Sequence, residues 1–92
     1  MKQSSSKHVL RFSRAAEKTL RQLQGKDKSL VVEALRILED DPMNPRFAVK
    51  LRGDWGGYFR IRKGNWRIVY RTEKDTVNVM YIRRRKEDTY RV

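Results

Sequence analysis

Cysteine is absent from the chain, and histidine nearly so, with the single residue His8 among 92. Without cysteine, neither a disulfide framework nor a thiolate metal site can form, which suits a reducing compartment. One histidine near the N-terminus also disfavours a histidine acid–base pair and a histidine metal cluster. Because these ligand sets are missing, we expect neither a metal ion nor another cofactor.

Long apolar runs are missing as well. No stretch approaches the ~18 apolar residues of a membrane span. The first residues, "MKQSSSKH", are polar and lack the apolar segment of a signal peptide. We therefore expect a flexible tail over residues 1–7, one small domain over residues 8–92, a cytoplasmic location and no membrane contact.

Positive charge is what the chain has in excess. Lys and Arg number 23 against 11 Asp and Glu, so the formal net charge is +12. Residues 1–45 contain nine basic and six acidic residues, and residues 46–92 contain fourteen basic and five acidic residues. Most of the positive excess therefore lies in the second half of the chain. Such a chain is attracted to a polyanion: nucleic acid, the ribosome, an acidic protein or an anionic membrane surface.

Hydrophobic periodicity predicts a strand and then two helices in the first half of the chain. Residues 8–13 alternate between apolar and polar side chains, as a short strand does. Ser13 is expected to cap a first helix that Gly25 ends, and Asp27 or Ser29 to cap a second. The segment "DPMNP" then ends the second helix, because proline cannot continue it.

Three further strands are predicted at 58–63, 66–72 and 76–83, after a loop over 44–57. With the first strand they would form a four-stranded antiparallel sheet. The predicted fold class is α+β, with two N-terminal helices, paired as an αα-hairpin, packed on the apolar face of that sheet.

A two-residue turn at Gly64-Asn65 sets the register of the central hairpin. It places Ile61 opposite Ile68 and Arg62 opposite Arg67, and cross-strand partners share a face. One face then carries apolar side chains and the other carries arginines: Phe59, Ile61, Trp66, Ile68 and Tyr70 against Arg60, Arg62, Arg67 and Arg71.

A second tight turn at Lys74-Asp75 extends this pattern to the last strand. A regular ladder adds Val79 and Tyr81 to the apolar face and leaves Met80, Ile82 and Arg84 on the arginine face. Four arginines would then converge on an open surface: Arg60, Arg62, Arg67 and Arg84. Guanidinium groups suit phosphate oxygens, so the surface is predicted to grip phosphates. The alternative is a merely solvated sheet face.

The segments "VLRFSRAAEKTLRQL", "AVKLRGDWGGYFRIRKGNWRIVYR" and "RRRKEDTYR" resemble the RelE/ParE superfamily of toxins from toxin–antitoxin systems. The resemblance extends over roughly residues 8 to 91. It implies the RelE-like, or microbial RNase-like, fold. In that superfamily the RelE branch cleaves messenger RNA in the ribosomal A site, and the ParE branch poisons DNA gyrase.

The resemblance implies a metal-independent endoribonuclease in which a ribose 2′-hydroxyl attacks the adjacent phosphate and translation is inhibited. The catalytic positions it carries over are Arg60, Arg62, Arg67, Arg84 and Tyr90. Residues that would bind RNA around them are Lys50, Arg52, Lys63, Arg71, Arg83, Arg85 and Lys86. Arginines can stabilise charge on phosphoryl oxygens, and Tyr90 could stack on a base or take part in proton transfer.

The chain departs from the best-known member of the RelE branch, which has lysines where this chain has Arg60 and Arg62. Arginine stays protonated and is a poor general base. Lys63, Lys86 and Tyr90 remain as possible proton carriers, so the base is unassigned. The alternatives are a gyrase inhibitor of the ParE type and a non-catalytic domain that binds nucleic acid or protein.

The resemblance also implies partners. RelE-like toxins are neutralised by a RelB-like antitoxin, whose acidic, amphipathic segments wrap the toxin in a hetero-oligomer. The net charge of +12 and the expected exposure of Met80 and Ile82 suit such a partner. The other implied partners are the ribosome, with its 16S ribosomal RNA, and messenger RNA.

Overall fold

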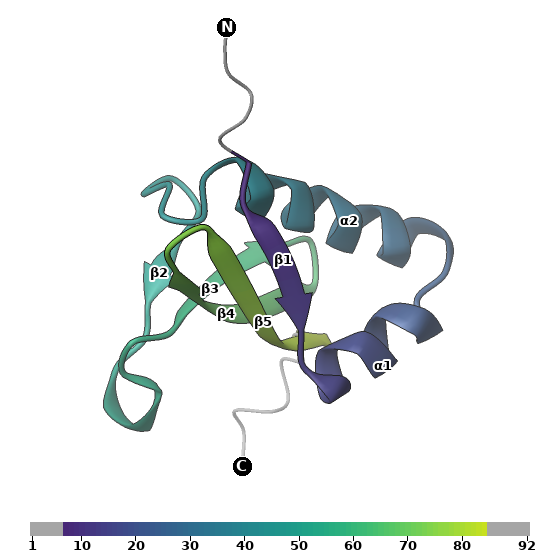
Figure 1. Ribbon diagram of the computed structural model, residues 1–92. Coiled ribbons are helices and arrows are strands. Elements are labelled where there is room, and N and C mark those ends of the chain that lie inside the picture. The colour runs from purple at the N-terminus through teal and green to yellow at the C-terminus, as the bar shows by residue number, and fades with distance from the viewer. Residues whose placement is uncertain (1–6, 85–92) are drawn as a thin grey trace, which may run out of the picture.

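The computed structural model describes residues 7–84 as two helices packed on one curved sheet (Figure 1). None of the helices in this range is long and apolar enough to cross a bilayer. In chain order the elements are β1 (Val9–Phe12), α1 (Arg14–Gln22), α2 (Gly25–Asp40), β2 (Val49–Lys50), the 3-10 helix η2 (Gly53–Trp55), β3 (Phe59–Lys63), β4 (Trp66–Glu73) and β5 (Thr76–Arg84).

The sheet has five strands in the order β1-β5-β4-β3-β2. β1 runs parallel to β5, and every other pair is antiparallel. The predicted four-stranded antiparallel sheet is therefore wrong in two respects. Val49–Lys50 adds a short edge strand, and β1 precedes the helices and reaches β5 in the parallel direction. Two residues are too few for a period-two pattern to reveal a strand.

The predicted caps of the two helices are confirmed only in part. Ser13 caps α1 as predicted, since its Oγ accepts a hydrogen bond from the N–H of Ala16 at 3.0 Å. The helix that follows begins at Gly25, with Gln24 as its cap residue, and not at Asp27 or Ser29. Gly25 has a φ of +57°, a conformation that glycine adopts readily, and this turns the chain from one helix into the next.

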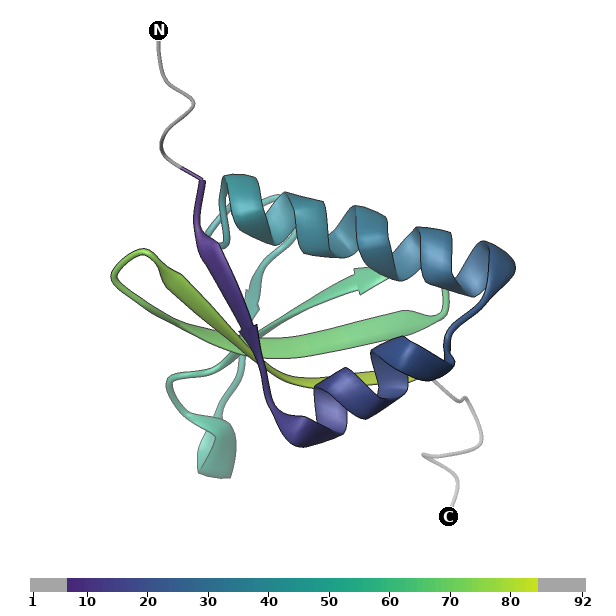
Figure 2. The same ribbon diagram turned by 45° about the vertical axis from the view of Figure 1, so that its right-hand side comes forward.

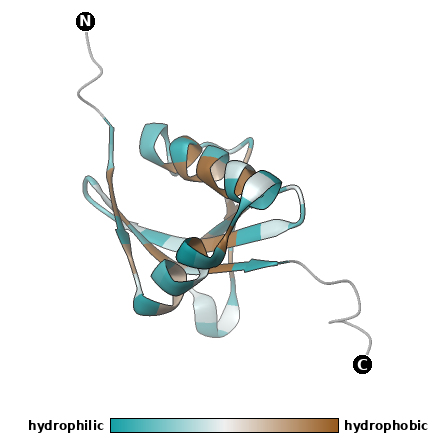
Figure 3. Cartoon of the chain, turned by 90° about the vertical axis from the view of Figure 1, so that its right-hand side faces the viewer, coloured by the Kyte–Doolittle hydropathy of each residue, from teal (hydrophilic) through white to brown (hydrophobic). Residues whose placement is uncertain are grey.

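Both helices cover the same face of the sheet, and their apolar stripes point towards it (Figures 2 and 3). The core between the layers contains side chains from both helices and from β3, β4 and β5: Ala16, Leu23, Val31, Ala34, Leu35, Leu38, Ile61, Trp66, Ile68, Tyr70, Val77, Val79 and Ile82. Tyr70 is fully buried, and its hydroxyl donates a 2.6 Å hydrogen bond to the carbonyl oxygen of Pro42. Burial, and then the charge of Asp41, raise the pKa of Tyr70 to about 12.

The central hairpin has the predicted register. Arg60 pairs with Val69, Ile61 with Ile68, and Arg62 with Arg67, so the apolar and arginine faces of β3 and β4 are confirmed. The opposite face of the sheet, which the helices leave uncovered, is called the open face below.

A β-bulge interrupts the ladder between β4 and β5. Tyr70 pairs with Val79, but Val69 pairs with Tyr81, so Met80 is an extra residue between them. Beyond the bulge every side chain of β5 changes face relative to a regular ladder. Val79 is buried as predicted, whereas Ile82 is 2% exposed and belongs to the core, and Tyr81 lies on the open face. The predictions for Tyr81, Ile82 and Arg84 were wrong for this one reason.

Candidate nucleic-acid interface

The open face carries side chains in rows that cross the strands. Arg62, Arg67 and Arg83 are paired across β3, β4 and β5 and form the first row, called the arginine row below. The next row contains Arg60, Val69 and Tyr81. Beyond the bulge, Arg71, Asn78 and Arg11 are paired across β4, β5 and β1. Six arginines therefore share one face of a domain whose helices cover the other.

The arginine row places three guanidinium groups on neighbouring strands, which lie about 4.8 Å apart. Arg62 and Arg83 are exposed, whereas Arg67 is half-buried with its Nε inside the surface. Like charges on adjacent strands repel, so a bound anion would stabilise the row.

Arg84 does not belong to this surface. It pairs with Trp66 on the helix side of the sheet, and its guanidinium donates to Asp27 Oδ2 at 3.0 Å. The same guanidinium lies 5.2 Å from the centroid of the Trp66 ring, and the indole Nε1 donates to Asp27 Oδ1 at 3.1 Å. These three residues tie the end of β5 to the first turn of α2. Because of the bulge, the open face carries Arg83, opposite Arg67, in place of Arg84.

Two predicted RNA-binding lysines also lie off the open face. Lys63 is on the helix side, with its Nζ 3.5 Å from Glu33 Oε1, and Lys50 pairs with Phe59 on the same side of the sheet. Arg52, Arg71 and Arg83 do lie at or on the open face. Tyr90, Arg85 and Lys86, the other predicted site residues, lie outside the described residues.

Sequence reasoning missed an aromatic cluster on the open face. Trp55, in η2, contacts Tyr58 edge-on with the ring centroids 5.1 Å apart, and Tyr81 in the same way at 5.6 Å. The Arg83 guanidinium lies 4.3 Å from the centroid of Tyr81, and that of Arg71 lies 5.8 Å from Tyr58. Both tyrosines thus contact an arginine of the same face. The cluster was missed because the bulge was not predicted, and a regular ladder between β4 and β5 would bury Tyr81.

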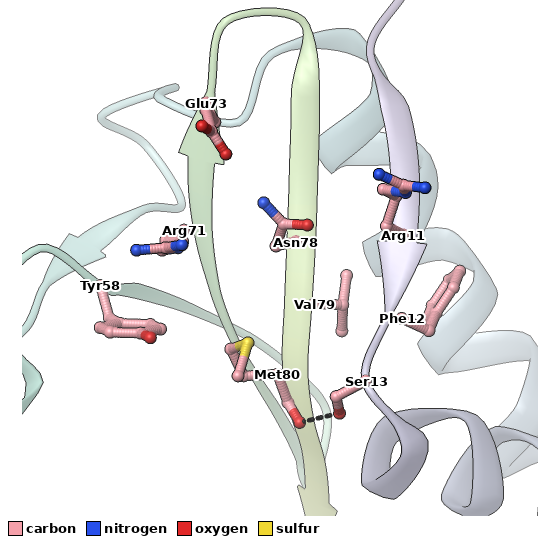
Figure 4. Close-up of a pocket in the computed structure, with 9 residues that line it drawn as sticks. All are labelled: Arg11, Phe12, Ser13, Tyr58, Arg71, Glu73, Asn78, Val79 and Met80. Carbon is pink, nitrogen blue, oxygen red and sulfur yellow. Dashed lines mark hydrogen bonds between the residues drawn. The ribbon is translucent and has the colours of Figure 1, made fainter.

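Two hollows open on this face. The larger, of about 430 Å³, lies over β1, β5 and β4, and Figure 4 shows Arg71, Asn78 and Arg11 around it, with Ser13 bonded to the carbonyl oxygen of Met80. The smaller, of about 200 Å³, lies beside the arginine row. Its lining combines arginines with aromatic and aliphatic side chains: Leu51, Arg52, Trp55, Arg67, Val69, Tyr81 and Arg83.

Comparison with known proteins decides the family. A model of the ParE toxin of type II toxin–antitoxin systems matches residues 10–89. The chain belongs to the ParE toxin family. The resemblance to the RelE/ParE superfamily is thereby confirmed, and the protein is a toxin of a type II toxin–antitoxin module. No curated protein sequence matches it.

Solved structures share the fold of this toxin. A chain of the RelBE2 toxin–antitoxin complex from Mycobacterium tuberculosis is 29% identical, with a TM-score of 0.74 over 86% of this chain and 99% of that one. The archaeal RelE–RelB complex from Pyrococcus horikoshii contains a chain at 24% identity, with a TM-score of 0.70 over 88% and 98%. The isolated RelE toxin of E. coli, at 21% identity and a TM-score of 0.73 over 87% and 86%, has the same fold.

The ParE-family toxin described here presents fixed positive charge and few groups that exchange protons. Arginine is always charged, and of the residues that line the smaller hollow only Tyr81 carries a hydroxyl and none carries a carboxylate. His8 lies at the N-terminal end of β1, with its Nδ1 3.3 Å from the carbonyl oxygen of Glu39. Among residues 7–84 no group of three His, Cys, Asp or Glu could hold a metal ion. The smaller hollow and the row beside it thus concentrate fixed positive charge.

Proposed function

We propose that this toxin is a ribosome-dependent messenger RNA endonuclease of the RelE type, which inhibits translation by cleaving RNA in the ribosomal A site. The observation that carries the proposal is the arginine row, with Arg60 in the neighbouring row, on a sheet face that the helices leave uncovered. A ribosomal location would place the toxin in the cytoplasm.

The chemistry follows from the fixed charges. When a ribose 2′-hydroxyl attacks the adjacent phosphorus, its oxygen bonds to phosphorus as the bond to the 5′ oxygen of the next nucleotide breaks, which leaves a 2′,3′-cyclic phosphate and a 5′-hydroxyl end. The hydroxyl proton passes to a base and the leaving oxygen takes up a proton, while negative charge increases on the non-bridging oxygens. Guanidinium groups already aligned on the sheet stabilise that charge without reorganising, and no metal is needed. Arg67 is the strongest contributor, because it is central in the row and half-buried, where charges are less screened by water. Tyr90 retains its implied role in stacking or proton transfer.

The proposed partner is a RelB-like antitoxin. Two of the solved relatives are in complexes, RelBE2 and a RelE–RelB pair. The net charge of +12 on this chain favours an acidic, wrapping segment. Such a segment would cover the open face and exclude RNA, and the two proteins would form a hetero-oligomer.

Gyrase inhibition is the second candidate. Two observations favour it: the matching family model is described as ParE, and no carboxylate, imidazole or lysine lines the smaller hollow beside the arginine row. A gyrase inhibitor needs a binding surface and no base.

Sequencing of RNA 5′ ends in cells after toxin induction distinguishes the endonuclease from the gyrase inhibitor. Endonuclease activity predicts new ends inside codons of translated messages, and their loss in Arg67→Ala. The control Arg36→Ala removes one exposed charge from α2, away from the open face, and should cut as the wild type does. Gyrase-linked DNA breaks with an unchanged pattern of RNA ends would overturn the proposal in favour of the second candidate.

A further inference from the structure

We infer that the smaller hollow on the open face, between Trp55 and the Tyr81–Arg83 pair, is a nucleobase-binding site for single-stranded RNA. This inference deepens the proposed function and rests on it, since it assigns a place to a base next to the phosphate-binding arginine row. We call the hollow the base pocket.

The size of the base pocket selects a small, flat ligand. Its volume of about 200 Å³ is below the ~300–1,000 Å³ of pockets that enclose drug-sized molecules. A single base with part of its ribose fits such a volume, whereas a folded peptide element does not.

The walls of the base pocket have the chemistry that bases bind. Trp55 is 39% exposed, so a large aromatic surface is open to solvent at the rim of the pocket. Arg83 lies over the Tyr81 ring, with its Cζ 4.3 Å from the ring centroid, and adds a guanidinium group to the wall of the pocket. Bases of single-stranded RNA stack on aromatic rings and on guanidinium planes alike.

The aromatic groups are also held in place before any ligand arrives. Two edge-on ring contacts fix Trp55, one to Tyr58 and one to Tyr81, at centroid distances of 5.1 and 5.6 Å. A ring that is already oriented loses little conformational entropy on binding, so more of the stacking energy appears as affinity.

Charge in the base pocket has one sign. Three arginines line it, Arg52, Arg67 and Arg83, and no acidic residue does. Because Arg67 belongs to both the pocket and the arginine row, a base inside the pocket has its own phosphate beside that row.

The bulge in β5 builds the base pocket. It moves Tyr81 to the open face and brings Arg83 into line with Arg67. Bulges that re-aim side chains in this way are common beside functional sites. Without it, Ile82 would face solvent and Tyr81 would be buried in the core.

The test uses the full-length toxin and a fluorescein-labelled RNA hexanucleotide with 2′-O-methyl riboses, which cannot be cut by 2′-hydroxyl attack. Anisotropy gives the affinity for wild type, Trp55→Leu, Trp55→Phe and Tyr81→Leu. Loss of one base–aromatic contact should weaken binding about 5- to 150-fold. Trp55→Phe keeps a ring and should lose much less than Trp55→Leu. Near-ultraviolet circular dichroism and melting temperatures confirm that each variant is folded.

Tryptophan fluorescence supplies an independent readout. Trp66 is only 7% exposed, so quenching by adenosine 5′-monophosphate should come from Trp55 and disappear in Trp55→Phe. Arg36→Ala, on α2, controls for a general loss of charge and should keep both the quenching and the RNA affinity.

The outcomes separate this inference from the proposed function. If Trp55→Leu and Tyr81→Leu bind the hexanucleotide as wild type does while Arg67→Ala binds weakly, the base pocket is refuted and the phosphate-binding row stands. If Trp55→Leu weakens binding of the antitoxin but not of RNA, the hollow is an antitoxin contact and the inference is wrong. If wild type binds no RNA on or off the ribosome, both proposals fail.

Discussion

Ser13 Oγ donates a 2.6 Å hydrogen bond to the carbonyl oxygen of Met80, the extra residue of the bulge, and the Ser13 N–H donates to the carbonyl oxygen of Val79 at 2.9 Å. The same Oγ accepts from the N–H of Ala16 and so caps α1. One side chain therefore joins the start of α1 to the point where β5 changes face. Helix capping and construction of the open face are coupled through this serine.

Replacing Ser13 with alanine should lower the free energy of unfolding by about 1–3 kcal/mol, since it removes a cap and a bond to the bulge. Urea denaturation measures the loss. Ser13→Thr keeps the hydroxyl and should lose under half as much. Thr19→Ala, which removes an exposed bond to the carbonyl oxygen of Ala15, should change stability by less than about 0.5 kcal/mol. Equal effects of Ser13→Ala and Thr19→Ala would contradict the coupling.

The neighbouring residues Arg83 and Arg84 should respond differently to alanine, because they lie on opposite faces of the sheet. Arg83→Ala should weaken RNA binding and leave stability near that of wild type. Arg84→Ala breaks a half-exposed ion pair with Asp27 and should cost about 0.2–1 kcal/mol in unfolding free energy while RNA binding is retained. RNA binding and urea denaturation of both variants are measured in parallel. A larger loss of RNA affinity in Arg84→Ala than in Arg83→Ala would show that Arg84 belongs to the RNA-binding site.

Alanine at Arg67 should reduce the rate of message cleavage on purified ribosomes by about 10²- to 10³-fold, the usual effect of losing one preorganised charge group. The expected stability change is small, and the affinity for the antitoxin should persist. A cleavage rate within a few-fold of wild type would remove Arg67 from the catalytic role.

At Tyr90, outside the described residues, phenylalanine and alanine should differ. We expect stacking to dominate, so Tyr90→Phe should keep substantial cleavage of ribosome-bound message and Tyr90→Ala should lose most of it. Proton transfer as the main role would make the two variants equally poor. Full activity in a chain truncated after Thr89 would remove both roles.

Tyr70 should make stability fall in alkaline solution. Its pKa is raised from 10.0 to about 12 in the fold, so its contribution is fully present below pH 10 and is lost as the pH rises towards 12. The loss should amount to roughly 2–3 kcal/mol. Urea denaturation of wild type and Tyr70→Phe between pH 9 and 12 isolates the contribution of the Tyr70 hydroxyl. The difference between their free energies of unfolding should shrink over that interval. A constant difference would contradict the shifted pKa.

The central hairpin could be predicted because its register depends on local information. The Gly64-Asn65 turn and the alternation around it leave one arrangement that buries the aromatic side chains, and β3 and β4 have it. The same reasoning placed Arg60, Arg62 and Arg67 together. The residues of this region and its flanks also carry the resemblance to the RelE/ParE superfamily, from which the RelE-like fold was expected.

The bulge could not be predicted, because "VMYIRR" offers a buriable side chain at both Tyr81 and Ile82. Alternation alone cannot choose between them, and the choice depends on Ser13, which lies 67 residues before Met80. The parallel pairing of β1 and the two-residue strand β2 are likewise tertiary outcomes. For this reason Arg84 was placed on the wrong face and the aromatic cluster was missed, while the arginines of the hairpin were placed correctly.

The pairing of β1 with β5 also affects the order of events during synthesis. Residues 9–12 pair with residues 76–79, so that Val9 lies opposite Thr76, far along the chain. Contacts this distant in sequence form late, because the intervening chain must first be ordered. A nascent chain therefore has neither the partner strand of β1 nor the residues Tyr81 and Arg83 until β5 itself has been made.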